Sequence, residues 1–136
     1  MRKSKNTVKE EAVKYITGIE NLELFIDEED EWNFHDSEIR SIHWDDKTRI
    51  LDVTVEPMGY SPKLPEDDPD RSPRLDFHFH GVVEINLQWN TVGFIFELDI
   101  TEEHGFLVCY FDSYPMVVTS RKLVIDKPRF VPKSES

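Results

Sequence analysis

Cysteine, glycine and long apolar runs are scarce in this chain of 136 residues, and each scarcity excludes a class of protein. Cys109 is the one cysteine, so no internal disulfide can form, and its apolar neighbours predict a buried thiol in a reducing compartment. The five glycines are scattered, which leaves no phosphate-binding loop. No apolar run approaches the roughly 20 residues that a membrane-spanning helix needs. We therefore expect no nucleotide cofactor and no membrane partner.

Length and N-terminal composition predict one cytoplasmic domain over residues 1–136. A chain of this size buries roughly two-thirds of the surface of its unfolded state, so it folds without a disulfide or a metal. Charged residues at 7–14 stand where a secretory signal would be apolar, which favours the cytoplasm. Residues 1–6 are expected to form a basic tail, and residues 127–136 a C-terminal tail.

Acidic residues dominate the charge, which is −12 over the whole chain. Residues 1–14 and 121–136 each carry +3, so residues 15–120 carry −18. Between Glu20 and Glu38 there are nine acids and no lysine or arginine. Such a field repels nucleic-acid phosphate and speeds the encounter with a basic protein, although acidity also serves solubility alone. We therefore expect no nucleic-acid partner.

The first structured element is expected to be a helix over residues 7–18. Thr7 and Glu10 have the spacing of a capping box, which satisfies free amide groups of a first helical turn. Gly18 is placed to end the helix. Apolar residues recur at helical spacing and form one stripe, which consists of Val8, Ala12, Tyr15, Ile16 and Ile19.

The middle of the chain predicts a hairpin followed by a long loop. Residues 38–44 and 49–56 alternate apolar and polar side chains about a turn at 45–48, which is typical of two antiparallel strands. Residues 57–73 hold five prolines and four acids. Because proline removes backbone donors, this segment is expected to be an acidic surface loop.

The second half of the chain predicts further strands. Apolar side chains at odd positions from Leu75 to Trp89 indicate one long bent strand, or two strands in phase, with Gly81 at the bend. Further strands are expected over 94–100, 106–111 and 116–125. The predicted fold class is therefore α+β, with an N-terminal helix followed by a mostly antiparallel meander sheet of six or seven strands.

The histidines are the residues best suited to metal binding or catalysis. His78 and His80 could share a metal ion with His35 or Asp36 if the fold joined them, but they alternate in phase with ordinary polar residues. No HExxH or cysteine–histidine spacing accompanies them. His35 and Asp36 are adjacent, so an extended segment points them to opposite faces. We predict no enzyme, no cofactor and no metal site; a metal-dependent enzyme and a structural or oligomeric module stay as alternatives.

Protein recognition has the widest support, because aromatic residues lie within or near two acidic regions. Interfaces favour aromatic anchors, and acids give rate and selectivity against a basic partner. Trp44 and Phe34 are expected to pack in the core, and the protein is expected to be a monomer or a homodimer. The residues predicted to bind a partner are Glu28, Glu29, Asp30, Glu31, Trp32, Tyr60, Glu66, Asp67 and Asp68.

A short motif carries a family resemblance. Trp32-Asn33-Phe34-His35-Asp36-Ser37, leading into a strand and a hairpin, resembles the Phe-His-Asp opening of a bacterial polymorphic-toxin immunity family, the one numbered fifty. The resemblance is sharp over residues 32–44 and general over 45–125. It implies a non-enzymatic cytoplasmic protein that binds and blocks a cognate toxin domain, in many cases a basic nuclease. Phe34, His35 and Asp36 are the motif residues, and we expect them to support the fold.

Overall fold

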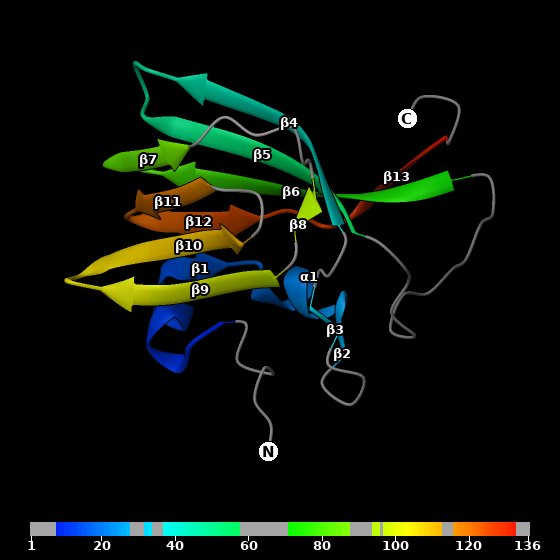
Figure 1. Cartoon of the computed structure of the whole chain (residues 1–136), viewed down its shortest axis with the longest axis horizontal. Coiled ribbons are helices and arrows are strands. Elements are labelled where there is room, and N and C mark those ends of the chain that lie inside the picture. The colour runs from blue at the N-terminus through cyan, green and yellow to red at the C-terminus, as the bar shows by residue number, and fades with distance from the viewer. Residues whose placement is uncertain are drawn as a thin grey trace.

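Two β-sheets pack face to face, with two short helices along one side (Figure 1). The structure is a computed structural model, and it describes residues 8–27, 32–33, 37–57, 71–87, 94–95, 97–112 and 116–132. Within these ranges no helix is long and apolar enough to cross a membrane.

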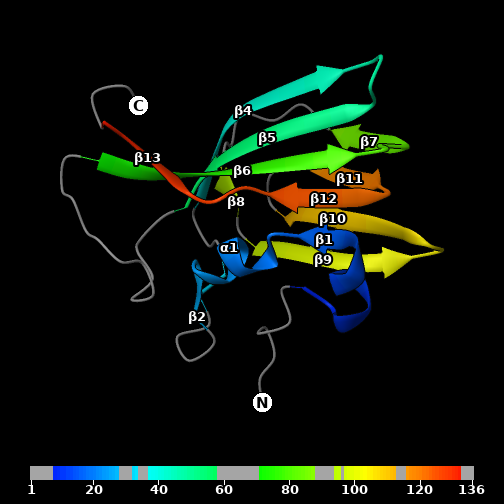
Figure 2. The ribbon, with the colours of Figure 1, turned by 180° about the vertical axis from the view of Figure 1, so that it is seen from behind.

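The larger sheet has seven strands, and Figure 2 shows it from its outer side. Six strands lie in a row, in the order β1 (Ile16–Thr17), β12 (Lys122–Ile125), β6 (Arg71–His80), β5 (Ile50–Glu56), β4 (Ser37–Asp45) and β8 (Phe94–Ile95). The seventh, β13 (Arg129–Pro132), pairs with the start of β6. β1 runs parallel to β12, and the other pairs are antiparallel. The predicted hairpin is confirmed as β4 and β5.

The smaller sheet has four antiparallel strands. In order across the sheet they are β7 (Glu84–Leu87), β11 (Met116–Ser120), β10 (Phe106–Asp112) and β9 (Glu97–Glu103). A separate ribbon consists of β2 (Ile26–Asp27) and β3 (Trp32–Asn33). In both views the four-stranded sheet covers one face of the larger sheet, so the other face of each is an outer face (Figures 1 and 2).

The core lies between the two sheets. Phe111 of β10 meets Phe77 and Phe79 of β6 edge-on, with ring centroids 6.1 and 6.3 Å apart, so aromatic rings join the sheets. Cys109 is buried as predicted, and burial, together with the charge of Asp99, raises the pKa of its thiol. The buried aliphatic residues include Leu51, Val53, Val55, Leu98, Ile100, Leu107, Val118 and Leu123.

The helix predicted over residues 7–18 is wrong. The chain instead forms a 3₁₀ helix, η1 (Glu10–Tyr15), then β1, then a short helix, α1 (Ile19–Glu23). The two residues of β1 are β-branched, and they pair with β12, so sheet pairing replaces helical hydrogen bonds there. The apolar stripe still meets the core, because Ala12 is buried and its apolar neighbours pack against the cluster.

Gly18 connects β1 to α1 and lies against the end of β12. Its φ of +86° is left-handed, and a Cβ there would lie 2.0 Å from the carbonyl oxygen of Ile125. The buried amide of Asn21 donates a hydrogen bond to the same oxygen at 2.9 Å. Thr7 of the predicted capping box lies outside the described residues, and no side chain caps η1 at Lys9.

A single meander is also wrong, because each of the predicted strand segments 75–89, 94–100 and 116–125 contributes to both sheets. The chain leaves β6 for β7 at Gly81, whose φ is +64°, and leaves β11 for β12 at Arg121. The amide of Arg121 donates to the carbonyl of Gly81 at 3.2 Å, so the two crossings are joined. At the crossing Val82 is buried and Val83 is 42% exposed, but in β7 the odd-numbered Ile85 again packs against the core, as predicted for two strands in phase.

The start of β6 and β13 pair to form an arm that extends beyond the packed sheets (Figure 1). β6 begins at Arg71 and includes Pro73, which lies opposite Phe130 of β13. The loop prediction is therefore wrong for residues 71–73, where pairing with the C-terminal segment makes a strand. Residues 58–70 lie outside the described part of the chain.

Candidate partner-binding site

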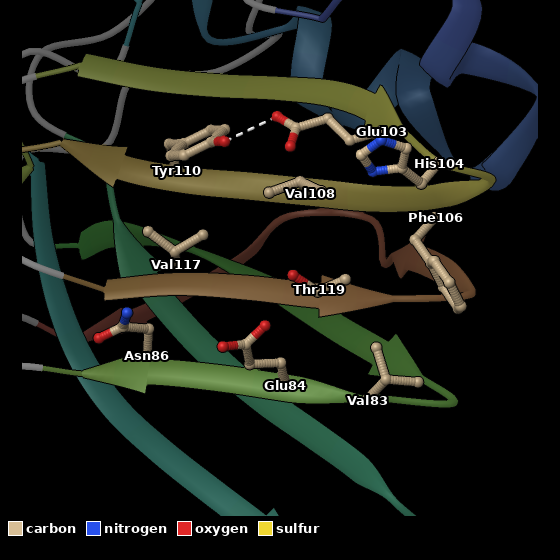
Figure 3. A pocket seen from close by; sticks show the side chains of 10 residues that line it. All are labelled: Val83, Glu84, Asn86, Glu103, His104, Phe106, Val108, Tyr110, Val117 and Thr119. Atoms are coloured by element: carbon tan, nitrogen blue, oxygen red, sulfur yellow. Dashed lines mark hydrogen bonds between the residues drawn. The ribbon is translucent and has the colours of Figure 1, made fainter.

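The outer face of the four-stranded sheet is hollowed, with a volume of about 540 Å³ (Figure 3). Its floor is apolar and comes from β10 and β11, through Phe106, Val108, Tyr110 and Val117. Polar side chains from the neighbouring strands and turn surround the floor, among them Glu84, Asn86, Glu103 and His104. The arrangement is that of a binding surface with an apolar centre and a polar rim.

Strand register explains why these side chains gather. Residues opposite each other in neighbouring antiparallel strands point to the same side of the sheet. Tyr110 lies opposite Asp99 of β9 and Val117 of β11, and Val108 lies opposite Thr119. Residues between them along β10, such as Cys109, point into the core.

The charge of the hollow is acidic. Among the described residues that line it there are two carboxylates, Glu84 and Glu103, and no lysine or arginine. Both carboxylates are exposed, and neither forms an ion pair with another described residue. Glu84 lies on β7 and Glu103 on β9, the two outer strands of the sheet. These strands are three strand spacings apart, which corresponds to roughly 14 Å.

Tyr110 and Glu103 form a hydrogen-bonded pair within the hollow (Figure 3). The Tyr110 hydroxyl donates to Oε2 of Glu103 at 2.7 Å. This hydrogen bond, with burial and the nearby negative charge, raises the pKa of Tyr110, so the phenol stays a donor at neutral pH. The hydrogen bond holds the Glu103 carboxylate beside the ring.

A smaller hollow of about 180 Å³ adjoins the first, and Val83 and Glu84 line both. Trp44 and Arg49 of the β4–β5 hairpin also line it, with the Arg49 guanidinium 5.4 Å above the Trp44 ring. Trp44, expected in the core, is 37% exposed near the tip of this hairpin. The amide of Val82 donates to the carbonyl of Arg49 at 3.1 Å, which ties the hairpin to the start of the smaller sheet.

The outer face of the seven-stranded sheet carries a contrasting cluster around His78. Its Nδ1 lies 2.6 Å from Oδ1 of Asp52, and its Nε2 lies 2.7 Å from Oδ2 of Asp126. Burial disfavours the charged imidazolium, but hydrogen bonds and charge from the two carboxylates outweigh it and raise the pKa of His78. The protonated ring can donate to both carboxylates at once.

Asp76 forms a second self-contained cluster on that face. It accepts hydrogen bonds from the Thr54 hydroxyl at 2.7 Å and from Arg129 Nε at 2.7 Å. Burial alone would raise the pKa of Asp76, yet the hydrogen bonds from Arg129 and Thr54 lower it. Glu56 likewise pairs with both Arg40, at 3.0 Å, and the buried Arg74, at 3.5 Å.

The predicted metal ligands do not assemble within the described residues. Both ring nitrogens of His78 contact carboxylates, and His80 lies further along β6, opposite Lys122. No group of three histidine, cysteine, aspartate or glutamate residues in the described ranges could hold a metal ion. His35 lies outside those ranges, so the described residues give no support to a metal-dependent enzyme.

Most residues predicted to bind a partner lie outside the described residues. Trp32 is placed only by its backbone, in β3 opposite Asp27. Their joint role therefore stays a prediction. The residues outside the described ranges are Glu28, Glu29, Asp30, Glu31, Tyr60, Glu66, Asp67 and Asp68, together with the motif residues Phe34, His35 and Asp36.

The hollow itself was not predicted from the sequence. Residues 106–111 form a continuous apolar run, which predicts a strand but does not show that Tyr110 lies on an outer face. Placing Glu84 on the same surface requires the change of sheet at Gly81, which brings β7 beside β11. A local pattern does not contain that long-range pairing.

Comparisons with known proteins do not place this chain in a family. No protein-family model matches it, and no match was found among curated proteins or among solved structures. The features that bear on function are therefore the hollow, the charge distribution and the short sequence motif.

Proposed function

We propose that this chain is a non-enzymatic immunity protein that binds a basic toxin domain and occludes it. The observation that carries the proposal is the hollow on the four-stranded sheet, where an apolar floor stands between Glu84 and Glu103. Apolar centres supply the binding energy of interfaces, and complementary charge sets rate and selectivity. A basic protein surface has the chemistry that fits both features.

The charge distribution supports the same proposal. Residues 15–120 carry −18, so the field around the body of the protein attracts cations and speeds association with a basic partner. Glu28–Glu31 and Glu66–Asp68 would extend the acidic surface. The Phe34-His35-Asp36 motif adds the resemblance to an immunity family, in which a cognate toxin is the partner.

Occlusion is a sufficient mechanism for this function. A protein seated on the toxin's basic substrate-binding surface excludes the substrate without a chemical step. The proposal therefore predicts one-to-one binding, with both proteins chemically unchanged. Because the contacts include exposed charges, added salt should slow association and weaken the complex.

The test requires the cognate toxin domain, which the proposal predicts to be encoded beside this gene. We expect the purified protein to bind that domain with a one-to-one stoichiometry in calorimetry, to abolish its activity, and to restore growth when the two are expressed together. Raising the salt from about 50 to about 500 mM screens the attraction between exposed charges, so it should weaken binding. A toxin that stays active beside an excess of this protein would overturn the proposal.

Neutralising residues 28–31 tests whether these four acidic residues contribute to toxin binding. The variant Glu28→Gln/Glu29→Gln/Asp30→Asn/Glu31→Gln should bind the toxin more slowly and with less dependence on salt. An unchanged association rate and salt dependence would show that these four residues are not part of the interface. That result would leave the hollow as the remaining candidate for the toxin contact.

A further inference from the structure

Arginine stacked on an aromatic ring recurs around the hollow. The Arg121 guanidinium lies 5.4 Å from the centroid of the Phe106 ring, and Arg49 lies 5.4 Å from that of Trp44 in the adjoining hollow. Such contacts are favourable because the ring face is electron-rich. Tyr110 is the third aromatic residue of this surface, and no cation of the described chain stacks on it.

Tyr110 is also the aromatic residue with a fixed carboxylate beside it. Its hydroxyl donates to one oxygen of Glu103 at 2.7 Å, and the side chain of Glu103 reaches from β9 towards the ring (Figure 3). A carboxylate can accept several hydrogen bonds, so this donation leaves acceptor capacity on both oxygens. The pair therefore offers a ring face and an anchored negative charge side by side.

The surroundings of this pair carry negative charge. Asp99 lies opposite Tyr110 on β9, and Glu84 stands across the sheet on β7. Arg121, the nearby cation, stacks on Phe106 at the turn end of the hollow, where Figure 3 shows Phe106 at the opposite end from Tyr110. A cation from another molecule at Tyr110 would thus meet attraction without having to displace this arginine.

We propose that Tyr110 and Glu103 form the binding site for an arginine side chain of the partner protein. The inference rests on the proposed function and names the group that the hollow recognises. Guanidinium is planar, stacks on aromatic faces and donates two parallel hydrogen bonds to a carboxylate. Lysine presents a compact, strongly hydrated charge and lacks that fork, so arginine is preferred at a site that combines a ring with a carboxylate.

The first test uses a small probe in place of the partner. N-acetyl-arginine amide is titrated into the intact protein, and the methyl signals of Val108 and Val117 and the ring signals of Tyr110 are followed by NMR. We expect a saturable shift confined to these residues and their neighbours, with affinity several-fold higher than for N-acetyl-lysine amide. Equal binding of the two probes, or shifts spread evenly over the acidic surface, would overturn the inference.

Matched variants assign the effect to Glu103. Glu103→Gln keeps an acceptor for Tyr110 and removes one charge, and it should weaken binding of the arginine probe about tenfold, the change expected for one charge-assisted hydrogen bond. Glu10→Gln makes the same change of net charge at an exposed residue of η1 and should leave the affinity within about twofold. Equal losses in the two variants would indicate general charge attraction and overturn the site.

The complex with the toxin domain separates this inference from the proposed function. Loss of affinity in Glu103→Gln, with Glu10→Gln unchanged, supports both. A toxin bound equally well by all three proteins leaves the function standing and overturns the arginine site. Concentration-dependent shifts of Val108, Val117 and Tyr110 in the protein alone would assign the face to a second copy of this chain, and would also overturn it.

Discussion

The outer faces of the two sheets are both rich in charge, but they use it differently. On the seven-stranded sheet the charges pair with one another, as Asp52 and Asp126 do with His78 and as Asp76 does with Arg129. On the four-stranded sheet Glu84 and Glu103 border an apolar floor and form no ion pair within the described residues. The first face is satisfied internally, whereas the second has charge left for another molecule.

Surface charge therefore has two separate roles in this strongly acidic protein. Paired carboxylates gain hydrogen bonds in the fold, so removing one leaves partners unsatisfied and costs stability. Exposed carboxylates without ion pairs gain little in the folded state, and like-charge repulsion among them slightly opposes folding. Equal charge changes on the two faces should therefore have opposite consequences for folding and for binding.

The largest expected loss of stability comes from a substitution at Gly18, where the backbone lies against the end of β12. Gly18→Ala should lower the free energy of unfolding by about 2–5 kcal/mol, since a left-handed backbone costs alanine about 1–2 kcal/mol and overlap with the Ile125 oxygen adds about 1–3 kcal/mol. Urea unfolding followed by circular dichroism measures the change.

The turn of the four-stranded sheet provides the control for Gly18. Gly105 has nearly the same φ, +85°, but a Cβ there meets no atom within 4 Å. Gly105→Ala should therefore lose only the backbone term of about 1–2 kcal/mol. If the two variants are equally stable, the contact of Gly18 with the end of β12 does not constrain the fold.

The next prediction compares one carboxylate from each face. Asp76→Asn should lower the free energy of unfolding by about 2 kcal/mol, because the amide turns a donor towards Arg129 and weakens charge-assisted hydrogen bonds. Glu84→Gln makes the same charge change at an exposed site and should alter stability by less than about 0.5 kcal/mol. A cost at Glu84 equal to that at Asp76 would remove the distinction between the faces.

The fold was predictable from the sequence where local pattern and sheet pairing agree. The β4–β5 hairpin follows from the alternation of Leu51, Val53 and Val55 about a short turn. The segment before Gly18 has a helical stripe, yet Ile16 and Thr17 pair with a strand more than 100 residues away. No local pattern specifies such a partner, and tertiary pairing overrode the helical preference.

The candidate site was less predictable than the fold. The apolar run of β10 does not reveal which of its residues face outwards, and the approach of β7 depends on the crossings at Gly81 and Arg121. Acidity is visible in the sequence, whereas the division into paired and unpaired carboxylates is not. His78 illustrates this, since its sequence neighbours do not include either of the aspartates that bind it.

The pH dependence of stability tests the paired face. Since the folded-state pKa of His78 is raised above 6.5, its ion pairs stabilise the fold fully below that pH, and the stabilisation is lost as pH rises through the folded-state pKa. The free energy of unfolding should therefore fall as the pH rises above about 6.5 and through the folded-state pKa. Urea titrations at intervals across this range measure the slope.

Two histidine variants identify the source of that slope. His78→Gln should flatten it, because glutamine does not titrate between Asp52 and Asp126. His104→Asn, at a left-handed turn position that asparagine tolerates, removes a histidine from the other face and should keep the slope. A slope retained in His78→Gln would show that groups other than His78 cause the pH dependence.

The smallest expected effect separates the ring of Tyr110 from its hydroxyl. Tyr110→Phe keeps the stacking surface and removes the exposed hydrogen bond to Glu103, so the free energy of unfolding should change by less than about 1 kcal/mol. Binding of N-acetyl-arginine amide should weaken about threefold, because the carboxylate loses its anchor but not its charge. A loss as large as that in Glu103→Gln would mean that the hydroxyl itself contacts the guanidinium. If Tyr110→Phe binds the arginine probe with unchanged affinity while Glu103→Gln binds it weakly, the aromatic ring and the carboxylate charge are enough for binding. The hydrogen bond that holds Glu103 beside the ring would then not be needed to recognise arginine.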